Sequence, residues 1–95
     1  TGLKIRNVKN DSESVIRTDG VFIAVGLVPN TERFQELVAL DKGGYIIAGE
    51  EGITQTPGVF AAGDIRTKKL RQVVTAVADG ANAVASAQHY LMTNK

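Results

Sequence analysis

Residues 53–76, ITQTPGVFAAGDIRTKKLRQVVTA, decide the fold of this 95-residue chain. Residues 59–62 form a short apolar run between two glycines, which predicts a buried strand because the run is too short for a helix. Gly63 and Asp64 end the run, a mostly charged loop follows, and a helix is predicted from Gln72 onward. A strand, a loop and a helix in this order indicate an α/β protein.

The predicted helix is the longest element of the chain. Its apolar side chains recur at helical spacing over about five turns, roughly 28 Å. The positions that form this stripe are Val74, Val77, Ala78, Ala81, Val84, Ala85 and Gln88. Small residues recur along the same segment from Ala76 to Ala87, which predicts close packing against a sheet or another helix.

Shorter elements are predicted before this helix. Residues 3–8 alternate apolar with polar and, after a turn, residues 14–18 continue the extended character, which indicates a hairpin. The continuous apolar run at 21–25 is typical of a strand buried on both faces. Thr31 is positioned to cap a short helix that ends near Leu40. A further short strand is expected at residues 45–48.

Composition excludes several classes of function. The net charge is +1, and the only basic cluster lies between Arg66 and Arg71, where we expect a solvated loop, so neither nucleic acid nor a membrane is an expected partner. No apolar run approaches the ~20 residues that span a bilayer. The chain has no cysteine, which excludes disulfides, thiolate metal sites and thiol catalysis within it. A reducing, cytoplasmic location is expected, and no metal site is predicted.

The loop between the strand and the long helix is the predicted binding site. Ligands of open α/β sheets lie beyond the carboxyl ends of the strands, next to a helix N-terminus. Gly63 allows close approach to the backbone, and the carboxylate of Asp64 is suited to accept hydrogen bonds from sugar hydroxyls. Arg71 and the free N–H groups of the helix that starts at Gln72 favour a phosphate or a developing anion.

Two strings carry a more specific resemblance. TPGVFAAGDIR, followed by RQVVTAVADGANAVASAQHYL with its arginine seven residues after the aspartate, resembles the C-terminal signature of bacterial-type thioredoxin reductases, in the pyridine nucleotide-disulfide oxidoreductase family. VFIAVGLVPNT is similar to that family's link between the NADPH-binding and FAD-binding domains. Together the matches cover most of the chain from Asp19 to Leu91.

The resemblance implies a partial FAD/NAD(P)-binding Rossmann-like fold. Residues 1–27 would be the tail of the NADPH-binding domain, a hairpin and a last strand, and residues 28–95 the C-terminal segment of a three-layer FAD domain. It further implies FAD as the cofactor, with NADPH in the parent enzyme. The FAD contacts that it implies are Gly63 and Asp64 at the ribityl and phosphate region, Arg71 and Gln72 at the flavin, and the N–H of Val73 at the pyrimidine edge of the isoalloxazine.

A complete reductase of this type requires parts that these 95 residues lack. No G-x-G-x-x-G fingerprint, second glycine-rich nucleotide loop or C-x-x-C pair is present. The chain alone is therefore expected to be catalytically inactive, with no catalytic residue, and His89 is expected to be structural. Its implied partners are the N-terminal remainder of the parent, a second copy in a homodimer or swapped oligomer, and a thioredoxin-like protein that the parent reduces.

Two functions from different classes stay open at the level of sequence. The first is part of an FAD-containing, NADPH-dependent disulfide oxidoreductase, either a thioredoxin reductase or a relative such as the flavoprotein partner of a peroxiredoxin or a ferredoxin-NADP reductase of the same build. The second is a non-enzymatic structural or self-association module that binds no flavin. In that case Asp64 would only cap a turn, and Arg71 and Gln72 would be ordinary exposed residues at a helix start.

Overall fold

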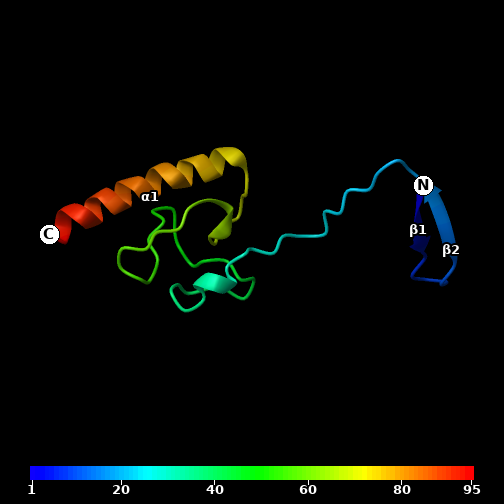
Figure 1. Ribbon diagram of the computed structural model, residues 1–95, viewed down its shortest axis with the longest axis horizontal. Helices are drawn as coiled ribbons and strands as arrows, with labels where there is room; N and C mark the ends of the chain where they lie inside the picture. Colours follow the sequence, from blue (N-terminus) through cyan, green and yellow to red (C-terminus); the bar gives the residue numbers. More distant parts are fainter.

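The computed structural model describes residues 1–95 and has two separated parts (Figure 1). A hairpin lies at one end, a packed body with a long helix lies at the other, and an extended segment joins them. The molecule measures 67 × 27 × 20 Å, and its radius of gyration is 20.0 Å. A compact domain of this length has a radius of gyration of roughly 12 Å, so the hairpin does not pack on the body.

The N-terminal part is the predicted hairpin. Strand β1 (Gly2–Arg6) pairs in antiparallel register with strand β2 (Glu13–Arg17), with Leu3 opposite Ile16. Both faces of this two-stranded sheet are exposed to solvent, including the side chains of Leu3 and Ile16. The hairpin prediction is confirmed, but the sheet receives no covering layer from the rest of this chain.

The strand predicted at residues 21–25 is not formed. The segment is extended but pairs with no other segment, and the side chains of Phe22, Ile23 and Val25 are almost completely exposed. A strand is stabilised by hydrogen bonds to a neighbour, and no other segment of this chain lies alongside to supply them. The apolar pattern correctly predicts extended backbone, but the prediction of burial is wrong for this chain.

The body is built from turns rather than from the expected helix and strands. Only a 3₁₀ turn, Glu32–Phe34, forms within residues 31–40, because the Thr31 hydroxyl donates to the Gly44 carbonyl at 2.6 Å and caps no helix. The predicted strands at 45–48 and 59–62 are reduced to isolated bridges. Ile46 pairs with Leu40 and Arg66, and Phe60 pairs with Ile53. Each expected strand is too short to form a ladder without further neighbours.

The predicted long helix is confirmed as α1 (Val73–Thr93). Its start is fixed by Thr75, whose Oγ1 accepts the Gln72 N–H at 3.1 Å. The valines of the apolar stripe do not face the body, because Val77 and Val84 are exposed. The packed face carries the small residues instead: a Cβ placed on Gly52 would lie 3.2 Å from the Cβ of Ala83. The prediction of close packing is thereby confirmed.

The apolar core of the body is small. It consists of Val38, Ile46, Ala48 and Ala61, two of which are alanines, and no large side chain is fully buried. Four other residues buried in the same part are polar or charged: Thr31, Thr54, Arg66 and Asp79. Polar and charged residues are therefore as numerous as apolar ones among the buried side chains of the body.

Limited proteolysis checks the separation into two parts. Chymotrypsin is expected to cleave first after Phe22, because this side chain is fully exposed in an unpaired extended segment, whereas Phe60 and Tyr90 are partly buried and pack edge to face. Mass spectrometry of early digests identifies the first products. Initial cleavage after Phe60 or Tyr90 would contradict this arrangement.

Candidate functional site

A buried carboxylate on α1 organises the loop that precedes this helix. Asp79 is 4% exposed and accepts two hydrogen bonds from Arg66, both at 2.7 Å. It also accepts one from the Lys68 ammonium at 2.8 Å and one from the Gly63 N–H at 2.9 Å. Arg66 is itself only 5% exposed. The expectation that Arg66 and Lys68 lie in a solvated loop is therefore wrong, because both turn inward to this carboxylate.

These contacts set the charge state of the group. The hydrogen bonds from Arg66 hold the pKa of Asp79 well below its usual range, against the opposing effect of burial, and Lys68 and Gly63 lower it further. The same interaction raises the pKa of Arg66. Asp79 is therefore a carboxylate at any physiological pH.

The Gly63–Ile65 turn is held against α1 by this carboxylate. Gly63 has a φ of +82°, a conformation that side chains other than glycine rarely adopt. A Cβ there would meet Ala76 only at an ordinary 3.7 Å, so conformation rather than space requires the glycine. The Asp64 side chain that follows is exposed, and its carboxylate forms no hydrogen bond or ion pair within the chain.

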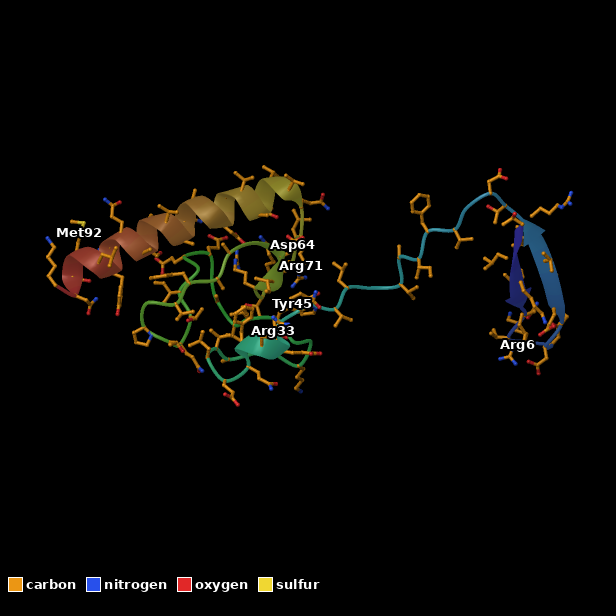
Figure 2. All side chains as sticks on the ribbon, viewed as in Figure 1. Arg6, Arg33, Tyr45, Asp64, Arg71 and Met92 are labelled. Atoms are coloured by element: carbon orange, nitrogen blue, oxygen red, sulfur yellow. The ribbon has the colours of Figure 1, made fainter.

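Arg71 lies beside Asp64 (Figure 2). Its guanidinium carbon lies 3.8 Å from the centroid of the Tyr45 ring. Its Nε donates to the Asp64 carbonyl at 3.0 Å, and its Nη2 donates to the Arg66 carbonyl at 3.2 Å. Arg71 has no carboxylate partner, so its positive charge is balanced only by the ring face and these two carbonyl oxygens.

A hollow of about 230 Å³ brings these groups together where the extended segment meets the body. Its lining residues are Leu27, Val28, Pro29, Asn30, Tyr45, Asp64, Ile65 and Arg71. Two of the predicted site residues, Asp64 and Arg71, therefore share one cavity. Gly63 supports the turn behind it, while Gln72 and Val73 lie exposed at the start of α1 and do not line the cavity.

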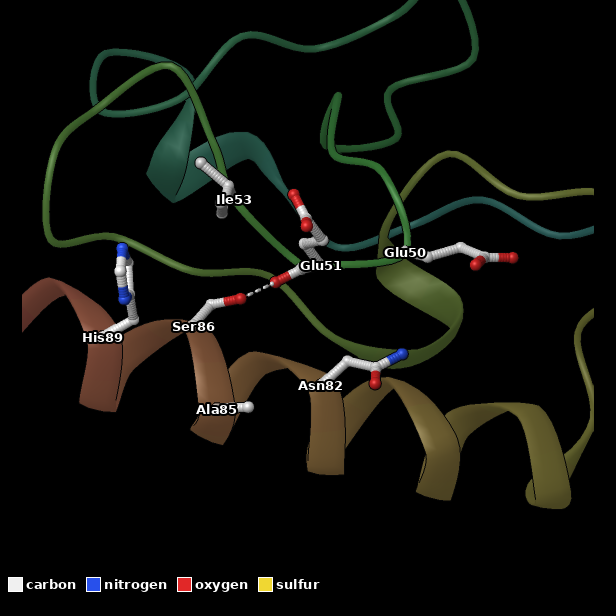
Figure 3. Close-up of a pocket in the computed structure, with 7 residues that line it drawn as sticks. All are labelled: Glu50, Glu51, Ile53, Asn82, Ala85, Ser86 and His89. Atoms are coloured by element: carbon white, nitrogen blue, oxygen red, sulfur yellow. Dashed lines mark hydrogen bonds between the residues drawn. The ribbon is translucent and has the colours of Figure 1, made fainter.

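A larger hollow of about 440 Å³ lies between α1 and the loop at residues 50–53 (Figure 3). The Ser86 hydroxyl donates to the Glu51 carbonyl across it at 2.8 Å, so that group is already used in packing. His89 lines the same hollow without an ion-pair partner. No group of three or more His, Cys, Asp or Glu side chains is arranged to hold a metal ion. The chain also contains no helix with the length and apolar character needed to cross a membrane.

Comparison with known proteins identifies the family of this chain. The sequence profile of the family "Pyridine nucleotide-disulphide oxidoreductase" matches residues 1–80. The chain belongs to this family. Among its pyridine nucleotide-disulphide oxidoreductase relatives, a thioredoxin reductase of Listeria monocytogenes is 52% identical over 91 residues, which are 96% of this chain and 28% of that protein. The thioredoxin reductase of Bacillus subtilis is 48% identical over 79 residues, which are 83% of this chain and 25% of that protein.

A solved structure extends the likeness to the fold. The thioredoxin reductase of Lactococcus lactis matches with a TM-score of 0.82 and 38% identity over 97% of this chain and 30% of that protein. The predicted α/β, partial Rossmann-like class is thus confirmed for this oxidoreductase family member. The chain spans less than a third of the length of the thioredoxin reductases that it matches.

Sequence reasoning misses two residues that shape the site. Asp79 is an acidic residue on the alanine-rich face of the helix. A carboxylate buried on such a face requires a cation beside it. The basic residues of the preceding loop are the one feature of the sequence that could have indicated this pairing. Tyr45 lies in a segment predicted as a strand, and nothing in its local pattern indicates that it lies beside Arg71. Both depend on contacts between distant segments.

Substitution of Asp79 tests the buried ion network. Asp79→Asn leaves two buried cations without a counter-ion, and removal of one partner of such a pair costs about 3–5 kcal/mol. We expect α1 to separate from the body, with a large fall in the midpoint of thermal unfolding followed by far-UV circular dichroism. Glu36→Gln, at an exposed acidic residue, is the matched control and is expected to unfold like the wild type.

The pH dependence of this effect has a defined sign. Because the pKa of Asp79 is lower in the folded state than in the unfolded state, its stabilisation is fully present above the unfolded value of about 3.9 and is lost as pH falls toward the folded value. The difference in unfolding midpoint between wild type and Asp79→Asn should therefore shrink as the pH is lowered below about 4. A difference that stays constant over this range would contradict the assigned network.

Proposed function

We propose that this chain forms part of the FAD site of an NADPH-dependent, thioredoxin reductase-like disulfide oxidoreductase. The observation that supports this most directly is the cavity shared by Asp64 and Arg71, which contains a carboxylate and a guanidinium that are not paired with each other. Family membership and the motif around Gly63 imply the cofactor. The charges present are suited to its two polar regions, the ribityl hydroxyls and the electron-rich edge of the flavin.

The dimensions of the cavity fit only part of this cofactor. Its volume of about 230 Å³ is below the roughly 300–1,000 Å³ of pockets that enclose a ligand of ordinary size. We therefore infer that the chain holds the ribityl and flavin regions and that residues outside it hold the remainder. When bound, FAD would supply the electron transfer between NADPH and a disulfide.

The proposed roles follow from the chemistry of each group. Asp64 accepts hydrogen bonds from the ribityl hydroxyls, and Gly63 sets the backbone conformation that presents this carboxylate. Arg71 and Gln72 contact the flavin, and the N–H of Val73 at the first turn of α1 contributes the partial positive charge of a helix N-terminus. These groups would stabilise negative charge on the cofactor.

Catalysis by the parent enzyme requires groups that this chain does not supply. The chain has no cysteine, so the redox-active pair and the nicotinamide site are assigned to other parts of the parent, and the 95 residues alone are proposed to be inactive. We assign residues 1–27 to the tail of the NADPH-binding domain and residues 28–95 to the C-terminal segment of the FAD-binding domain. A thioredoxin-like protein is the proposed electron acceptor.

Self-association is proposed for the isolated chain. The outward face of α1 exposes large apolar side chains along its length, namely Val73, Val74, Val77, Val84 and Leu91. In the parent, the remainder of the FAD domain or a second subunit would cover this face. Without them, a second copy of the chain offers the nearest apolar surface.

Sedimentation velocity tests this association. The wild-type chain is expected to form dimers or larger species at high micromolar concentration, and the double substitution Val77→Glu, Val84→Glu should shift it toward the monomer. Val8→Glu makes the same chemical change at an exposed valine of the hairpin and serves as the control. A wild-type chain that remains monomeric would refute the proposal.

Titration with FAD tests the binding site. We expect saturable binding with a structured visible flavin spectrum, and Asp64→Ala should weaken it by at least ~10-fold because a charge-assisted hydrogen bond is lost. Glu36→Ala, which removes an exposed carboxylate elsewhere, should bind FAD like the wild type. Equal affinities for wild type and Asp64→Ala would remove Asp64 from the site, and absence of binding by the wild type would show that residues outside this chain hold most of the affinity for the cofactor.

A further inference from the structure

Arg71 has donors that the protein leaves unused. A guanidinium carries five N–H groups, and within this chain only Nε and Nη2 donate, to the carbonyls of Asp64 and Arg66. Nη1 donates to no protein group. The plane of the group is thus fixed along one edge by two carbonyls and on one face by the Tyr45 ring, at 3.8 Å from its centroid.

Tyr45 is placed by a turn with its own hydrogen bonds. The Asp41 carboxylate accepts the N–H groups of Gly43 and Tyr45 at 2.8 and 2.9 Å, and the Asp41 N–H donates to the Tyr45 carbonyl at 2.8 Å. Gly44 has a φ of +84°, and its carbonyl accepts the Thr31 hydroxyl. The turn therefore fixes the position of the ring independently of Arg71.

We propose that Tyr45 is a positioning residue that holds the Arg71 guanidinium flat, with its free donors available to the negative edge of the flavin. This inference rests on the proposed FAD site. A long arginine side chain loses much rotational freedom when it is immobilised on binding, and stacking in advance removes part of that cost. The face of the Tyr45 ring also stabilises the positive charge of Arg71, which has no carboxylate partner, because cations are attracted to aromatic faces.

The ring face, rather than the hydroxyl, is the part of Tyr45 that acts. The Tyr45 hydroxyl forms no hydrogen bond within the chain, whereas the face of its ring contacts the cation. Phenylalanine should therefore replace Tyr45 without loss, and leucine should not. A fluorinated phenylalanine at position 45 keeps the shape of the ring but weakens its negative face, so this residue separates packing from charge attraction.

Nuclear magnetic resonance of the Arg71 Nε–Hε group tests the positioning without any cofactor. In the wild type and in Tyr45→Phe, we expect a ring-current shift of this proton and slow exchange with solvent. Both features should be lost in Tyr45→Leu, and exchange should accelerate with the fluorinated ring although the fold is retained. Identical exchange for Phe and fluorinated Phe at position 45 would overturn the inference.

FAD titration of the same variants connects positioning to binding. Tyr45→Leu should weaken FAD binding by about 3- to 10-fold, and Tyr45→Phe should leave it unchanged. In the background of Arg71→Gln, neither substitution of Tyr45 should change the FAD affinity further. If FAD binds the wild type and Tyr45→Leu equally well, the positioning role is refuted while the proposed function stands. If the wild type binds no FAD but the Arg71 resonance depends on the ring, FAD binding by these 95 residues alone is refuted and the positioning of Arg71 by Tyr45 stands.

Discussion

The buried carboxylate of Asp79 is the constraint on which the body of this chain depends. A core of Val38, Ile46 and two alanines offers little apolar area to hold a 21-residue helix in place. Asp79 compensates by accepting from Arg66, Lys68 and the Gly63 backbone, which all belong to the loop before the helix. Because each donor is charged or held in a turn, these hydrogen bonds have specific geometry. They fix the orientation of α1 relative to the preceding loop as well as holding the two together.

This network extends from the core to the candidate site through the backbone. The Arg66 side chain donates to Asp79, and the Arg66 carbonyl accepts a hydrogen bond from Arg71. The Gly63 N–H also donates to Asp79, and Gly63 directly precedes Asp64. The two groups that are proposed to contact FAD are therefore placed by the same buried charge, although neither touches it. Tyr45 adds an independent constraint from another segment. A polar site on an irregular loop can be rigid when a buried ion pair and a hydrogen-bonded turn hold it from two sides.

Local pattern is sufficient to predict some elements and not others. The hairpin at β1 and β2, the helix α1 and the Gly63 turn follow from alternation, helical spacing and glycine chemistry, which are properties of neighbouring residues. The strands predicted at 21–25, 45–48 and 59–62 require partners, and pairing is a property of the whole fold. Asp64 and Arg71 are predicted from the motif, whereas Asp79 and Tyr45 act through contacts with distant segments that no local pattern encodes.

Two apolar surfaces of this chain lack a covering layer. The apolar run at residues 21–25 and the valine face of α1 both have the pattern of buried surface, yet both are exposed in this chain. Exposure of this much apolar surface is unfavourable, so the pattern is best explained if other protein covers these faces in the functional state. The thioredoxin reductases that the chain matches are more than three times its length, which provides for such a covering. The polar groups of the candidate site are thus placed by contacts within this chain, whereas its two exposed apolar surfaces have no partner within it.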